Sequence, residues 1–224
     1  MKVKSILLIL YFTICLATIL FEIRNQSMLV VHAKLFIIPI ISIYYLVVCN
    51  YKIKFIKGLI LCFCFIGQNF VILFPNDSAI GSLLGFLLAN LLLLFLVFQE
   101  FKKLRLKKTD MIPILISLLL ICLTCITVMS LEYEKIKIDF SLYNLYAIIL
   151  STLCFFTVNY YIKKGSYAFF NLVLMISCFV FSDIFFMLNY FYLKIPVFSL
   201  IAVITQVLSY FFMINYFIES DKYH

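Results

Sequence analysis

Long apolar runs separated by short polar breaks occupy the chain from one end to the other. The runs are continuous rather than alternating, and about 20 largely apolar residues cross the hydrocarbon core of a bilayer as one helix. A membrane β-barrel would show runs of about 10 residues with alternating hydrophobicity. The pattern predicts an all-α fold, a polytopic helical membrane bundle with eight transmembrane helices: Ser5–Ile23, Met28–Asn50, Phe55–Phe74, Ser78–Gln99, Met111–Leu131, Phe140–Ile162, Tyr167–Tyr192 and Ile195–Ile218.

The polar breaks are too short to separate domains, so we expect a single membrane domain over residues 1–224. Composition agrees with this interpretation, because 66% of the residues are hydrophobic and 12% are charged. A soluble domain usually carries about 25% charged residues. A lipid-facing surface needs few charges, which makes an integral membrane protein the expected class.

The basic residues predict the orientation of the bundle. If the N-terminus is cytoplasmic, most of the 18 lysines and arginines fall on the cytoplasmic side, as the positive-inside rule requires. We therefore expect both termini in the cytoplasm and interpret the net charge of +8 as a topology signal, with no nucleic acid as partner. The same topology leaves on the outer side Arg24, Lys34, Lys135, Lys137 and Lys194.

Asp183 is the most informative residue, because it lies within the apolar seventh run. A carboxylate at the centre of a membrane helix costs about 2.5–3.5 kcal/mol on insertion scales. Such residues usually face the bundle interior and mark a functional site, and a buried carboxyl suits a general acid or a proton carrier. The alternative is a structural hydrogen bond between two helices.

Other polar side chains fall at similar predicted depths in the outer half of the bundle. Gln68 and Asn90 lie in the third and fourth runs, Gln206 in the eighth, and Lys34 near the outer end of the second. A polar cavity open to the outer half would gather them around Asp183. The alternative is that each amide ties one helix to its neighbour, worth about 0.6 kcal/mol on average.

Several chemistries are excluded by what the sequence lacks. It contains no GxxxxGK[ST], GxGxxG or HExxH pattern, the signatures of phosphate, dinucleotide and zinc sites. Two histidines are too few for most metal centres, and the cysteines fall mainly in apolar runs, where buried cysteine behaves as a small hydrophobe. We expect no metal and no cofactor.

Several short motifs resemble one membrane protein family. Phe181–Phe191 resembles an F-x-x-SD-x-x-L-A-x-x-x-F stretch, and Tyr210–Ile218 resembles a Y-Y-x-A-Q-Y-L-I ending with Asn215 at the glutamine. Lys34–Pro39 resembles K-P-L-x-x-P, and Ser82–Asn90 resembles G-x-x-x-F-x-x-x-H. In this order they resemble the YhhN family of lysoplasmalogenase-like integral membrane proteins, which have eight helices.

The resemblance implies an activity, a partner and a location. It implies hydrolysis of the vinyl ether of lysophospholipids, with membrane lipids as partners, in a bacterial plasma membrane. Asp183 would be the catalytic acid of this reaction. The residues that would contact substrate are Lys34, Gln68, Asn90, Ser182 and Asn215.

The chain departs from the family pattern at three positions. Gln68 follows Gly67 where the family has an aspartate, Asn90 stands where it has histidine, and Leu35 stands where it has proline. Since Gln68 cannot exchange a proton as a carboxyl does, the sequence leaves open whether the protein is an enzyme. The other hypotheses are a non-catalytic lipid-binding or structural membrane protein derived from this family, and a small proton-linked transporter.

Overall fold

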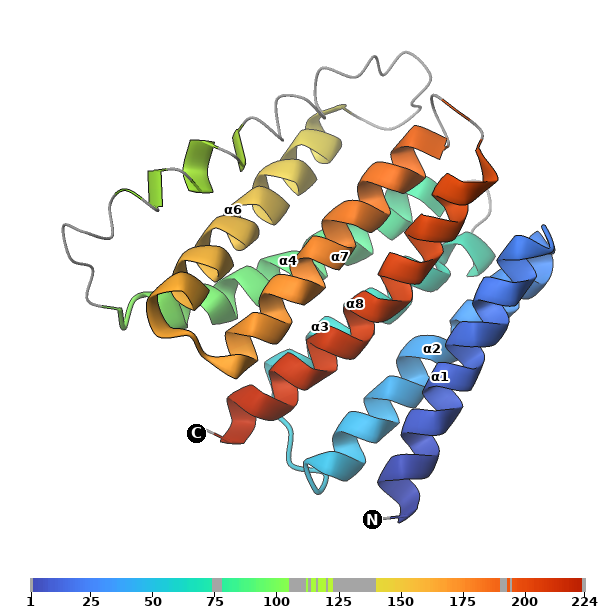
Figure 1. Ribbon diagram of the computed structural model, residues 1–224, viewed down its shortest axis with the longest axis horizontal. Helices are drawn as coiled ribbons and strands as arrows, with labels where there is room; N and C mark the ends of the chain where they lie inside the picture. The colour runs from blue at the N-terminus through green and yellow to red at the C-terminus, as the bar shows by residue number, and fades with distance from the viewer. Residues whose placement is uncertain are drawn as a thin grey trace.

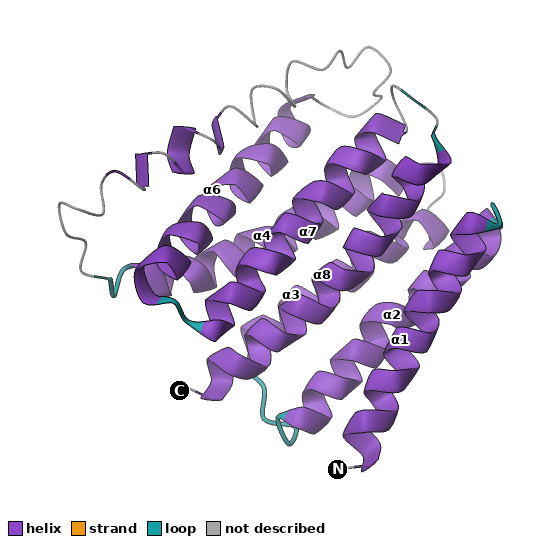
Figure 2. Ribbon diagram, in the orientation of Figure 1, coloured by secondary structure: helices purple, strands orange, loops and turns teal. Residues whose placement is uncertain are grey.

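The computed structural model describes residues 2–73, 78–104, 112, 114–115, 117–119, 121–122, 140–189, 193 and 195–222. Every regular element in this part of the chain is helical (Figure 2). The helices, labelled in Figure 1, are α1 (Lys2–Ile23), α2 (Ser27–Val48), α3 (Phe55–Leu73), α4 (Ser78–Phe101), α6 (Phe140–Lys164), α7 (Tyr167–Met187) and α8 (Pro196–Lys222).

Six of the described helices are long and apolar enough to cross a membrane, and α3 contributes a shorter apolar stretch, Phe55–Phe70. The chain is therefore a multi-pass helical integral membrane protein. The fifth predicted crossing, Met111–Leu131, falls mostly outside the described residues, so the count of eight stays a prediction.

Helix boundaries differ from the predicted ones mainly at the last two helices. The α-helical part of α7 ends at Met187, and Leu188 and Asn189 form a π-helical turn. The predicted continuation to Tyr192 lies outside the described residues. Leu193 N–H donates to the Leu188 carbonyl at 2.9 Å, a bond over five residues that is typical of this wider winding. α8 continues to Lys222, four residues beyond the predicted end.

Short turns place successive helices side by side and antiparallel (Figure 1). Gly165 separates α6 from α7 with φ +60°, the left-handed conformation that glycine adopts after a helix end. The turn between α2 and α3 uses Asn50 and Tyr51 at φ 51° and 61°. Both chain termini lie at one end of the bundle, called the terminal end here. The other end is called the far end.

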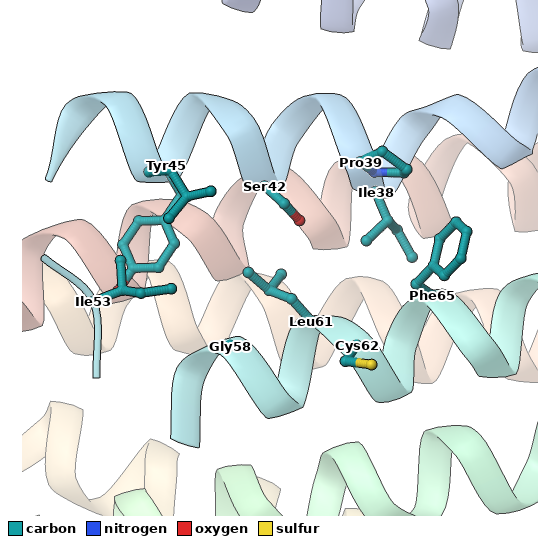
Figure 3. A pocket seen from close by; sticks show the side chains of 10 residues that line it. Ile38, Pro39, Ser42, Tyr45, Ile53, Gly58, Leu61, Cys62 and Phe65 are labelled. Atoms are coloured by element: carbon teal, nitrogen blue, oxygen red, sulfur yellow. The ribbon is translucent and has the colours of Figure 1, made fainter. Parts of the chain in front are cut away.

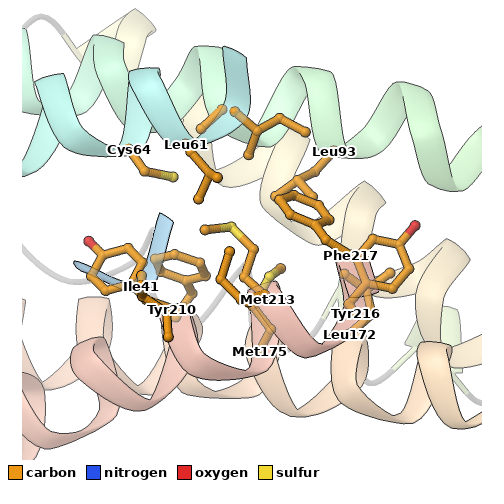
Figure 4. Packing of buried hydrophobic residues seen from close by; sticks show 14 of the residues in the cluster. Ile41, Leu61, Cys64, Leu93, Leu172, Met175, Tyr210, Met213, Tyr216 and Phe217 are labelled. Atoms are coloured by element: carbon orange, nitrogen blue, oxygen red, sulfur yellow. The ribbon is translucent and has the colours of Figure 1, made fainter. Parts of the chain in front are cut away.

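The interior of the bundle is apolar and centred on α8, which packs against α1, α2 and α7. Tyr210, Met213 and Phe217 of α8 are fully buried against Leu172 and Met175 of α7 (Figure 4). Large apolar side chains also cover the outside, for example Ile6 and Ile9 of α1, which are 61% and 66% exposed. A surface of this kind is expected where lipid replaces water as the solvent.

Glycines bring α3 and α4 into close contact. A Cβ atom on Gly85 would lie 2.5 Å from the Gly67 Cα and 2.7 Å from the Gly67 nitrogen. Gly81 also faces α3, where the Phe70 ring occupies the space of a side chain. Small residues four apart are a common device for close helix packing in membranes. This contact fixes α3, which carries Gln68, against α4, which carries Asn90.

Candidate functional site

Asp183 lies on α7 near the far end, and its partner is a tyrosine of α6. The Tyr146 hydroxyl donates to the Asp183 Oδ2 at 2.7 Å. Asp183 is half-buried within the protein, and Tyr146 is buried. The α-helical winding ends four residues after Asp183, so the residue lies about 6 Å along the helix axis from that point. A π-helical turn follows, a feature that occurs frequently at functional sites.

Asn90 of α4 joins this pair through Tyr146. Its side chain lies beside the Tyr146 hydroxyl, within range to interact with it, and the residue is buried. Three helices, α4, α6 and α7, therefore meet at one tyrosine hydroxyl. Asn90 orients Tyr146, and Tyr146 holds the carboxyl.

Lys34 and Gln68 form a second polar group on α2 and α3. The Lys34 ammonium donates to the Gln206 Oε1 at 2.8 Å, and the Gln68 amide nitrogen donates to the Lys34 carbonyl at 3.0 Å. Glu22 of α1 lies within electrostatic range of the ammonium and accepts a hydrogen bond from Ser199. The Gln68 Oε1 atom is buried and has no partner among the described residues.

Tyr210 connects the two groups. It is fully buried on α8, one turn after Gln206. Its hydroxyl lies beside the Gln206 side chain and within electrostatic range of Asp183 and Cys64. No hydrogen bond of ordinary geometry satisfies this hydroxyl within the described part of the chain. We call the connected set the Asp183 cluster; its members are Lys34, Gln68, Asn90, Tyr146, Asp183, Gln206 and Tyr210.

Two of the predicted site residues lie elsewhere. The Ser182 hydroxyl donates to the Ala202 carbonyl at 3.0 Å, so Ser182 ties α7 to α8. Asn215 is half-buried on α8, nine residues after Gln206. At 100° per residue these two side chains point in opposite directions from α8. The predicted role of Ser182 and Asn215 beside Asp183 therefore has no support from their positions.

The two tyrosines of the cluster were missed by the sequence reasoning. Aromatic residues in membrane spans are usually lipid or interface contacts, so a buried tyrosine does not differ in sequence from its neighbours. The available signal was position, because Tyr146 and Tyr210 each carry a hydroxyl inside an apolar run. Buried hydroxyls require a partner, which predicts a polar neighbour but not its identity.

A second buried polar group lies at the terminal end, where sequence alone predicted only topology signals. Lys57 of α3 is 3% exposed and donates to the Phe217 carbonyl, the Ser220 Oγ and the Asp221 Oδ1 at 3.0, 2.7 and 2.8 Å. The Tyr45 hydroxyl donates to the Asp221 Oδ2 at 2.8 Å. We call this group the Lys57 cluster; its members are Tyr45, Lys57, Ser220 and Asp221.

The fold and these two clusters define a class, a multi-pass helical membrane protein with a carboxyl-containing polar cluster inside its bundle. Comparison with protein-family models, with curated proteins and with solved structures finds no match to the chain. The resemblance to the YhhN family therefore stays an expectation from sequence motifs. Function has to be argued from the Asp183 cluster.

Proposed function

We propose that the protein binds a membrane lysophospholipid at the Asp183 cluster and hydrolyses its vinyl ether bond, as the resemblance to the YhhN family implies. The observation that carries this proposal is the incomplete pairing of the cluster. Gln68 Oε1 is buried without a hydrogen-bond partner in the described part of the chain, and the Tyr210 hydroxyl lies beside the Gln206 side chain but makes no hydrogen bond of ordinary geometry there. An unpaired buried polar atom costs about 1–3 kcal/mol, so a ligand that bonds both atoms would recover this free energy.

The charges of the cluster fit a phospholipid head group. The Lys34 ammonium has three N–H donors, and one of them is directed at Gln206. An ammonium is a common phosphate-binding group. We place the phosphate of the substrate at Lys34 and a polar group of its glycerol between Gln68 and Tyr210.

Asp183 supplies the proton chemistry in this proposal. Its protonated carboxyl donates a proton to the β-carbon of the enol ether, which leaves an oxocarbenium ion. The resulting carboxylate accepts a proton from the water that attacks the α-carbon. The hemiacetal then breaks the bond from its carbon to the glycerol oxygen, its hydroxyl proton passes to that oxygen, and an aldehyde and the glycerophospho-alcohol leave. Tyr146 keeps the carboxyl in position through its 2.7 Å hydrogen bond.

Helix directions support eight crossings with Met111–Leu131 as the fifth. α6 and α8 both run from the far end to the terminal end, with α7 returning between them. α4 runs in the same direction as α6. The chain between α4 and α6 has to return to the far end, and a helix over Met111–Leu131 would cover that distance. Even-numbered crossings and the basic-residue bias agree with cytoplasmic termini.

A second candidate is a non-catalytic lipid-binding protein, and the bonding of Gln68 favours it. The Gln68 amide donates to a backbone carbonyl at the position where the family motif has an acid. No second carboxylate hydrogen-bonds to Asp183, Tyr146 or Tyr210 in the described residues. On this hypothesis the cluster recognises a lipid without changing it.

One experiment separates the candidates. Purified protein in lipid nanodiscs is incubated with a vinyl-ether lysophospholipid and, in parallel, with its saturated alkyl-ether analogue, which cannot be protonated at carbon. The hydrolase predicts aldehyde from the vinyl ether only, and a loss of at least about 100-fold in Asp183→Asn, in the range for a general acid. Tyr44→Phe on α2 serves as the control.

Binding of both lipids without aldehyde would support the second candidate and contradict the first. Binding is measured by native mass spectrometry, because the chain has no tryptophan whose fluorescence could report it. Binding of neither lipid would overturn both candidates.

A further inference from the structure

An apolar groove runs between α2 and α3 in the terminal half of the bundle (Figure 3). Its volume is about 290 Å³, and its walls reach from Ile53 at the terminal end to Phe65. Ser42 of α2 contributes a hydroxyl to a lining that is otherwise almost entirely apolar. The groove is separate from the Asp183 cluster, none of whose members lines it.

The groove exists because neither helix fills the space between them. Gly58 lines it without a side chain, and a Cβ atom there would meet only the Ile53 Cδ1, at 3.6 Å. Pro39 lies inside α2 and cannot donate the hydrogen bond to the carbonyl four residues earlier, which weakens the helix locally. An open apolar groove on membrane helices excludes water and accommodates a hydrocarbon chain.

The terminal end of the groove is basic. Lys52 and Lys54 flank the groove-lining Ile53 in the turn between α2 and α3, and both are exposed. Within the described residues no carboxylate forms an ion pair with either lysine. Lys57, nearby, is already paired with Asp221 at 2.8 Å. The charge at this end is therefore available to an anionic head group.

We propose that the groove and its flanking lysines, Lys52 and Lys54, bind an anionic phospholipid, with one acyl chain between α2 and α3 and the head group at the two ammonium groups. A lysine near an anionic lipid surface contributes about 1 kcal/mol, so two lysines at one head group select for its charge. The apolar walls recognise the chain without regard to the head group. This site is distinct from the substrate site proposed above.

Native mass spectrometry of the detergent-purified protein tests the proposal with phosphatidylglycerol and phosphatidylcholine of identical chains. Wild type is expected to retain phosphatidylglycerol preferentially. The double variant Lys52→Gln/Lys54→Gln should lower its retention about 30-fold, as expected for two lysines at about 1 kcal/mol each, and leave phosphatidylcholine unchanged. Gly58→Leu, which fills the groove, should lower retention of both lipids.

The matched control is Lys102→Gln/Lys164→Gln, which removes the same charge from two exposed positions. Lys102 lies just after α4, and Lys164 lies at the end of α6. An equal loss in the control and in the Lys52/Lys54 variant would show a general surface-charge effect and overturn the proposal. Unchanged phosphatidylglycerol retention in the Lys52/Lys54 variant would overturn it as well. Hydrolysis of a vinyl-ether lipid does not enter this test, so its outcome is independent of the proposed function.

Discussion

The two buried polar clusters differ in how completely their hydrogen bonds are satisfied. In the Lys57 cluster the ammonium makes three bonds to protein groups, and both Asp221 oxygens accept one. In the Asp183 cluster an amide oxygen and a tyrosine hydroxyl make no hydrogen bond of ordinary geometry in the described part of the chain. A saturated cluster holds helices together. A cluster with buried atoms unpaired has bonding capacity left for a ligand or a substrate.

The largest expected effect comes from breaking the saturated cluster. Asp221→Ala leaves the Lys57 ammonium buried without its counter-ion, and removing one partner of a buried pair costs about 3–5 kcal/mol. The unfolding free energy, measured by chemical denaturation in mixed micelles, should fall by that amount. The double variant Lys57→Met/Asp221→Leu removes both charges and should lose much less. Equal losses in the single and double variants would contradict a paired role.

The next largest effect is expected at the helix contact that supports the Asp183 cluster. Gly85→Ala places a methyl group 2.5 Å from the Gly67 backbone, and overpacking of this kind costs about 1–3 kcal/mol. Gly58→Ala is the control, because its Cβ atom has ordinary clearance at 3.6 Å. Thermal unfolding in detergent compares the two variants. A Gly85→Ala protein as stable as Gly58→Ala would contradict the close contact.

A matched pair of tyrosines gives the smallest and sharpest test. Tyr45→Phe removes a hydrogen bond to the Asp221 carboxylate and should lower stability by about 1.5 kcal/mol, the low end for bonds to charged groups. Tyr210→Phe removes a hydroxyl that makes no hydrogen bond of ordinary geometry within the described residues, so stability should stay unchanged or rise slightly. For lysophospholipid binding the order should be reversed, with the larger effect in Tyr210→Phe.

Lysophospholipid binding by the same two variants completes the comparison. Tyr210→Phe is expected to bind about fivefold more weakly, since one hydrogen bond contributes about 1 kcal/mol, while Tyr45→Phe should bind as wild type does. If Tyr210→Phe destabilised the protein as much as Tyr45→Phe, its hydroxyl would be structural and the contrast between the clusters would fail.

The class of fold could be predicted from the sequence, and the site could be predicted only in part. Lys34, Gln68, Asn90 and Asp183 were expected in one half of the bundle, and they join one connected cluster there. The links between them, Tyr146 and Tyr210, were not predicted. Ser182 stays a prediction as a site residue, and the structure shows that its hydroxyl donates to the Ala202 carbonyl of α8.

Lys57 shows why a count of charges along the sequence does not predict which lysines are buried in the bundle. The sequence places it among the basic residues that determine orientation, and the structure buries it against α8, more than 160 residues later in the chain. Partner choice between distant helices depends on helix rotation and tilt. A pattern along one helix does not encode either quantity.

The long apolar runs of this chain determined that it forms membrane helices, because each backbone polar group in lipid must be satisfied within its own helix. That requirement is local, so it can be read from sequence. The tertiary structure decided which polar groups were paired and which were left open, through contacts such as Gly67 with Gly85 and Tyr146 with Asp183. Those contacts depend on shape across several helices, and lipid contributes no hydrophobic force that would select among helix pairings.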